Sequence, residues 1–286
     1  MIDVSPRPDA PVHFAAVGDV HGHMNAMVRA LSEWERRAGV DLAFVLQVGD
    51  FEPHRGEADL RTMAAPARYR ALGDFPEYAA RRRSFPWPVY FIGGNHEPYG
   101  FLDRLAAGDE AAPGCTYLGR AGVRTIGGLR VASLSGIHVP ERLSGRPPVD
   151  AIDQVSKKAY IGFCEAEVLA VLEAERADVL LVHEWPAGVI ADADAAAFEN
   201  QRRSMRYDGV GNEYARLLVD HLRPSLVLCG HMHRAYRRRL GDTQLCALAE
   251  VGAGADAFAF FRADAGEIVE VGGPSGGRGR VGRPAP

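Results

Sequence analysis

The chain has 286 residues, 47% of them hydrophobic and 24% charged, with a formal net charge of −4 at pH 7. This length suits one domain with a complete core, and no apolar run approaches the roughly 18 residues that a bilayer-spanning helix needs. The negative balance argues against a protein that coats nucleic acid through bulk electrostatics, because displacing counterions from phosphates needs a basic surface.

The first residues of the sequence and its cysteines predict an intracellular protein. The start, MIDVSPRPDAP, has acidic residues and prolines where a secretory signal would have basic and then apolar residues, so we expect a cytoplasmic location. The four cysteines lie far apart without a C-x-x-C pair, which predicts buried thiols and no disulfide framework. We expect a tail over residues 1–11, one domain over 12–271 and a disordered Gly/Pro/Arg tail over 272–286.

The first half of the chain predicts strands that alternate with helices. The apolar run 13–17 reads as a strand, and the following segment places Met27, Ala30, Leu31 and Trp34 on one helical face. Further strands are predicted at 43–48 and 89–92.

The second half predicts shorter, turn-rich elements. A proline-rich polar stretch occupies 140–158, and helices are expected at 163–175 and 213–221. The expected strands lie at 116–118, 123–126, 129–134, 179–182, 226–228, 245–249 and 257–261.

Five of the predicted strand ends carry Asp, Asn or His. They occur in the motifs GDVHG, VGDFE, GGNHE, VHEWP and CGHMH. The carboxyl edge of an open α/β sheet is where ligands bind, and these oxygen and nitrogen donors suit divalent ions such as Mn²⁺, Fe²⁺ or Zn²⁺. The glycines beside them let the backbone turn sharply and approach a metal or a phosphate closely. Together the motifs predict a metal centre.

In this order and at these intervals, the five motifs resemble the signatures of the calcineurin-like metallophosphoesterases, from Phe14 to His233. Within that superfamily the chain is most similar to RNA lariat debranching enzymes, through the stretches 57–69, 91–97, 117–123 and 128–137. It differs from them at Asp19, where debranching enzymes generally have cysteine.

The resemblance implies an α/β (α+β) fold, a four-layer αββα sandwich of two mixed sheets flanked by helices. It also implies two divalent metal ions (Mn, Fe or Zn) and a water between them that attacks phosphorus as hydroxide. The implied site residues are Asp19, His21 and His233 on one ion, Asn95, His183 and His231 on the other, Asp50 bridging both, His96 donating a proton to the leaving oxygen, and Arg55 binding phosphate.

The expected function is a metal-dependent phosphodiesterase that acts on a nucleic acid or nucleotide, with no membrane and no protein partner. A phosphomonoesterase and a catalytically inactive scaffold are the alternatives. The arginine runs 81–83 and 237–239 are either solvated faces or local basic patches.

Overall fold

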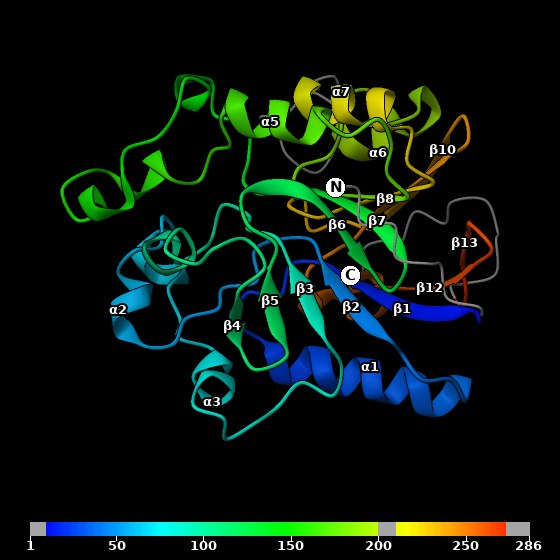
Figure 1. Ribbon diagram of the computed structural model, residues 1–286, viewed down its shortest axis with the longest axis horizontal. Helices are drawn as coiled ribbons and strands as arrows, with labels where there is room; N and C mark the ends of the chain where they lie inside the picture. The colour runs from blue at the N-terminus through cyan, green and yellow to red at the C-terminus, as the bar shows by residue number, and fades with distance from the viewer. Residues whose placement is uncertain (1–9, 200–209, 273–286) are drawn as a thin grey trace.

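The computed structural model describes residues 10–199 and 210–272, in which two sheets pack face to face between layers of helix (Figure 1). Helix α1 (Met24–Ala38) covers one outer face, and α5 (Glu165–Leu172) and α7 (Glu213–Leu222) cover the other. Three buried apolar clusters, one between each pair of adjacent layers, hold the sandwich together. The predicted four-layer fold is confirmed.

The first sheet is mixed, with strand order β13-β12-β1-β2-β3-β5-β4. Its strands are β1 (Val12–Val17), β2 (Phe44–Gln47), β3 (Val89–Phe91), β4 (Glu110–Ala112), β5 (Cys115–Tyr117), β12 (Phe258–Asp264) and β13 (Glu267–Glu270). The central run β1-β2-β3-β5 is parallel, so the carboxyl ends of these strands share one edge.

The second sheet is also mixed, with strand order β10-β11-β9-β8-β7-β6. Its strands are β6 (Ala121–Ile126), β7 (Leu129–Leu134), β8 (Val179–Val182), β9 (Leu226–Cys229), β10 (Tyr236–Leu240) and β11 (Thr243–Ala247). The strands β7, β8, β9 and β11 are parallel, and the edge strands β6 and β10 run antiparallel to their neighbours.

Short helices lie in the connections. They are α2 (Glu57–Leu60), α3 (Phe75–Ala79), α4 (Tyr99–Leu102) and α6 (Ala195–Glu199). Single 3₁₀ turns occupy Ala67–Tyr69, Pro140–Arg142, Val149–Ala151, Lys157–Ala159 and Asp192–Asp194, and a longer 3₁₀ segment covers Val251–Ala257. The predicted polar stretch 140–158 therefore consists mainly of turns.

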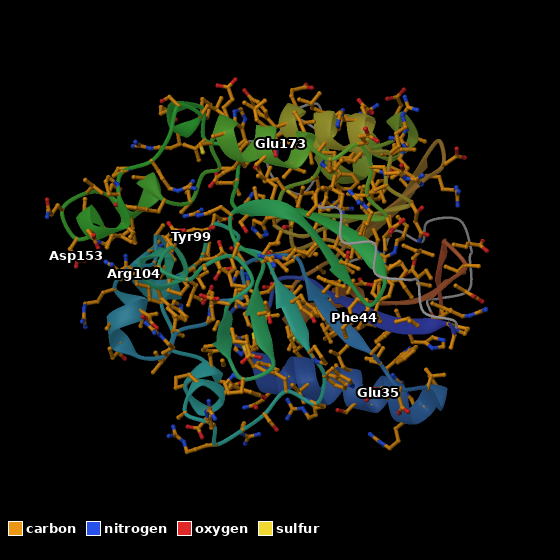
Figure 2. All side chains as sticks on the ribbon, viewed as in Figure 1. Glu35, Phe44, Tyr99, Arg104, Asp153 and Glu173 are labelled. Carbon is orange, nitrogen blue, oxygen red and sulfur yellow. The ribbon has the colours of Figure 1, made fainter. Side chains whose placement is uncertain are left out.

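Strand β1 shows how the residue pattern builds the layers. Side chains alternate along a strand, so Ala15 and Val17 face the α1 layer while Phe14 faces the second sheet. Between the sheets Phe14 stacks on Phe44, with ring centroids 5.0 Å apart, and on Phe261, at 5.2 Å (Figure 2 labels Phe44). This aromatic stack forms the centre of the inter-sheet core.

Some predicted features need correction. The edge strands β4, β10 and β13 and the short helices were not predicted. All four cysteines are free, as expected, but Cys164 is only half-buried because it is the N-cap residue of α5. No helix in residues 10–199 and 210–272 combines the length and the apolar character needed to cross a membrane. The predicted tails lie almost entirely outside the described residues.

Removing the central aromatic ring should destabilise the sandwich. We expect Phe14→Ala to lower the free energy of unfolding by about 3–5 kcal/mol, because loss of the large side chain leaves a cavity that two packed sheets cannot close. Urea denaturation followed by circular dichroism measures this change. Val269→Ala, at a β13 side chain that is 46% exposed, is the control and should change stability little. Equal effects of the two substitutions would contradict this account of the core.

Candidate metal centre

The predicted donors lie in the loops that follow five parallel strands, three in the first sheet and two in the second. The loops after β1, β2 and β3 carry Asp19, Asp50 and Asn95, and those after β8 and β9 carry His183 and His231. Because the two sheets face each other, these loops meet at one edge of the sandwich.

One cluster of four side chains has the spacing that a metal ion requires. Asp19, His21, Asp50 and His233 each offer a donor atom, and these atoms all lie within 4.8 Å of one another. Nε2 of His233 lies 3.0 Å from Nε2 of His21 and 3.1 Å from Oδ2 of Asp19. Two imidazole nitrogens and two carboxylates that converge in this way form a donor set that fits a divalent cation.

A second group adjoins the first through Asp50. Nε2 of His183 lies 3.2 Å from Oδ1 of Asn95 and 3.5 Å from Oδ1 of Asp50. The His183 and His231 rings are 5.0 Å apart between centroids. On its other side, Nδ1 of His183 donates to the Val48 carbonyl oxygen at 2.9 Å, which fixes the ring and leaves Nε2 facing the group.

The two aspartates also hold the loops together. Asp19 accepts from the backbone N–H of His231, at 3.0 Å to Oδ1, and Asp50 accepts from the backbone N–H of His96 at 2.7 Å. Each carboxylate thus joins two loops that are distant in sequence. The backbone around them adopts the left-handed region, with φ of 50° at Asp50 and 67° at His231, a conformation that non-glycine residues adopt only when the surrounding structure enforces it.

Two glycines are required for this close approach. A Cβ atom at Gly94 would lie 2.2 Å from Oδ1 of Asp50, and one at Gly230 would lie 2.2 Å from Oδ1 of Asp19. A side chain at either position would displace a carboxylate, which is a more specific reason for these glycines than the sharp turns expected from the sequence.

The carboxylates perturb the pKa values of the histidines. Burial alone would lower the pKa of His21, but the Glu52 hydrogen bond and the carboxylates of Asp50, Glu52 and Asp19 raise it to about 9. Burial would also lower the pKa of His183, but the carboxylates of Asp50 and Asp19 raise it to about 10. His231 differs, because burial and the neighbouring His183 lower its pKa to about 4. Protons therefore compensate the carboxylates in the metal-free chain, and binding a cation would release them.

Two glutamates support the site, although the sequence assigned them no role. Oε1 of Glu52 lies 2.7 Å from Nδ1 of His21. Glu97 is fully buried and accepts from the backbone N–H groups of Phe51 at 2.9 Å, Glu52 at 3.0 Å and Gly94 at 3.2 Å. Burial and the charge of Asp50 raise the pKa of Glu97 to about 8. The sequence contained a signal for this role, because each of these glutamates is the last residue of one of the five motifs.

The predicted acid His96 and the predicted phosphate ligand Arg55 lie in different settings. His96 lies beside the cluster, with its ring centroid 5.5 Å from that of His21 and its side chain 27% exposed. Arg55 donates to both carboxylate oxygens of Asp59, at 2.7 and 2.8 Å, and stacks over the Phe101 ring. Its charge is therefore already compensated.

Comparison with known proteins identifies the class. The calcineurin-like phosphoesterase family matches residues 12–235, and the chain belongs to this family of hydrolases. Among solved structures, the fold is similar to GAP50, the anchor in the inner membrane complex of Plasmodium, with a TM-score of 0.50 and 12% identity over 92% of this chain and 84% of that one.

Within the family the chain is similar to lariat debranching enzymes, as the sequence motifs suggested. The enzyme from Entamoeba histolytica is 31% identical over 84% of this chain and 69% of its own length. The enzyme from Danio rerio is 30% identical over 77% of this chain, which spans only 40% of that relative. The family uses divalent metal ions, and the cluster of Asp19, His21, Asp50 and His233 could hold one.

Asp19 provides a direct test of metal binding. If it is a ligand, Asp19→Ala should reduce the bound metal after purification, and Asp19→Cys should shift occupancy from Mn²⁺ or Fe²⁺ toward Zn²⁺, because a thiolate is softer than a carboxylate. Elemental analysis of the three proteins measures both effects. Asp41→Ala, at an exposed aspartate, is the matched control. Unchanged stoichiometry in Asp19→Ala would leave Asp19 with only a structural role in its loop.

Proposed function

We propose that this protein is a two-metal phosphodiesterase that hydrolyses a phosphodiester of a nucleic acid or nucleotide. The observation that carries the proposal is the convergence of a complete donor set from five strand ends onto one edge of the sandwich. An inactive scaffold would be expected to have lost some of these donors, and none is missing from this chain.

The side chains would divide between two ions that share one ligand. Asp19, His21 and His233 would hold the first ion, and Asn95, His183 and His231 the second. Asp50 would contact both, which its position between the two groups supports. When bound, two divalent ions neutralise the phosphoryl oxygens and lower the pKa of the attacking water.

His96 is proposed to protonate the leaving oxygen. Its backbone follows Asn95 directly, its ring lies beside His21 with the two centroids 5.5 Å apart, and its partial exposure leaves the ring accessible to substrate. Its Nδ1 atom lies 3.7 Å from Oε1 of Glu52. A carboxylate at that distance can orient the ring so that the opposite nitrogen, Nε2, is directed to the substrate.

A diester is favoured over a monoester by charge. A phosphomonoester carries an additional negative charge, which an unpaired arginine would help to bind, but the Arg55 guanidinium is held by Asp59. For Arg55 to bind the substrate phosphate, as the sequence suggested, this pair would have to open. Nucleic acid as the substrate class is supported by the similarity to lariat debranching enzymes.

The metallated protein should hydrolyse bis(p-nitrophenyl) phosphate faster than p-nitrophenyl phosphate. Chelator should abolish the activity and Mn²⁺ should restore it, because the donors alone offer no activated nucleophile. Release of p-nitrophenolate measures both reactions. Faster turnover of the monoester would favour the phosphomonoesterase alternative, and no turnover of either compound by a fully metallated preparation would refute the enzyme proposal.

His96→Ala should lower kcat by about 10²–10⁴-fold while both metals stay bound, the range expected for the loss of a positioned proton donor. A diester with a good leaving group, which needs little protonation, should lose less activity than an alkyl diester. Initial rates with the two substrates, together with metal analysis, test this. Loss of one metal from the variant would show that His96 serves the metal site instead.

A further inference from the structure

A basic cavity lies between α1 and the segment that follows α3. Its volume is about 430 Å³, and its α1 wall carries Asn25, Arg29, Ser32 and Arg36. These residues recur at intervals of three and four, so they share one helical face. Arg83 and Ser84 contribute the opposite wall, and the lining includes no carboxylate.

The arginines of this cavity are not used to hold the fold. Among residues 10–199 and 210–272, the guanidinium groups of Arg29, Arg36 and Arg83 make no salt bridge or hydrogen bond. Their neighbour Arg82 differs, because it pairs with Glu77 at 2.7 Å. Arg83 lies within electrostatic reach of Glu77. In a chain with a net charge of −4, three arginines without a hydrogen-bonded carboxylate nevertheless share one cavity, and their mutual repulsion is relieved when an anion binds.

The second arginine run serves as a contrast. On β10, Arg237 pairs with Glu270 at 2.9 Å and also donates to the Ala247 carbonyl oxygen. Arg238 donates to the Val189 carbonyl oxygen, and Arg239 to that of Asp242. Of the two runs that the sequence left open, 81–83 contributes Arg83 to this cavity, whereas the arginines of 237–239 bond to neighbouring groups of the fold.

The cavity is rigidly joined to a loop of the candidate metal centre. The hydroxyl of Tyr78 donates to Oδ1 of Asn25, and the Asn25 backbone N–H donates to Asp74, both at 2.9 Å. The Asp74 backbone N–H donates in turn to the carbonyl oxygen of Gly22, at 2.8 Å, in the loop that carries His21. Both walls are thus positioned before a ligand arrives, which lowers the entropy cost of binding.

The shape of the cavity suits a chain of phosphates. Helix α1 begins at Met24, three residues after His21, and a helix rises 1.5 Å per residue, so Asn25 and Arg36 lie about 16 Å apart along its axis. Arginine binds phosphate bidentately, and Ser and Asn side chains donate to phosphate oxygens. Cations distributed over this length match successive phosphates of a strand better than one small anion.

We propose that this cavity binds backbone phosphates of the nucleic-acid strand whose phosphodiester lies at the metal centre. The inference rests on the proposed function and extends it, because it adds a binding track that leads away from the metal ligands along α1. It also accounts for an acidic protein that binds a polyanion, since the positive charge is local.

Binding of a labelled oligonucleotide tests the proposal without turnover. Fluorescence anisotropy of the full-length protein in EDTA, with a fluorescein-labelled single-stranded RNA of 12 nucleotides as the probe, gives the dissociation constant at several salt concentrations. The combined variant R29A/R36A/R83A should bind at least about tenfold more weakly and show a shallower salt dependence, because each lost phosphate contact removes counterion release. Arg37→Ala, which removes an exposed α1 charge outside the cavity, should bind like the wild type.

The outcomes separate this inference from the proposed function. Equal binding by the wild type and the triple variant overturns the cavity proposal, whatever the activity. Displacement of the RNA by inorganic phosphate at the same total phosphate concentration also overturns it, since the cavity would then take a small anion. Wild-type turnover of bis(p-nitrophenyl) phosphate is measured separately, so its absence would refute the enzyme while the binding result stands. Circular dichroism of the triple variant excludes misfolding as the cause of weaker binding.

Discussion

The site depends on two buried carboxylates, Asp19 and Asp50, whose negative charge has to be compensated within the protein. Burying a carboxylate is costly unless it is paired and hydrogen-bonded. Each aspartate therefore collects a backbone N–H group and imidazoles from loops that are distant in sequence. The left-handed backbone at these loops and the glycines that contact the carboxylates follow from this requirement. The same arrangement that compensates the charge supplies the donors that a divalent cation requires.

The sequence predicted most central strands and the principal helices because each has a clear pattern. Buried strands such as β8 are continuous apolar runs, and α1 places its apolar residues on one face. It did not predict β10 or β13, because edge strands are half exposed and their charged residues resemble a loop. The candidate donors were recognised as motifs, whereas the support that Glu97 gives to three backbone N–H groups depends on three-dimensional contacts. The pairing of Arg55 with Asp59 likewise needed coordinates.

The basic cavity likewise could not be predicted from the sequence alone. Arg83 belongs to a visible charge run, and Arg29 and Arg36 share one face of α1, but nothing in the order of residues joins that face to Arg83. The two walls of the cavity are brought together by the hydrogen bonds that fix the α3 segment against the first turn of α1. The net charge of the sequence is negative, and it does not reveal that positively charged side chains gather in one cavity.

The contact between Gly22 and Gly73 constrains how the chain length can vary. A Cβ atom at Gly73 would lie 2.6 Å from the Gly22 carbonyl oxygen, so the backbones touch where the segment after α2 returns to the loop that carries His21. The segment between these glycines includes α1 and β2, and its two ends are fixed against each other at this contact. Met63 and Ala65 are buried, but residues 66–68, 70 and 71 are exposed, so insertions among these can extend outward without moving the pinned ends. A single methyl group at Gly73 would instead push directly on that loop. The protein should therefore tolerate a change in the length of this exposed stretch better than a substitution of either glycine.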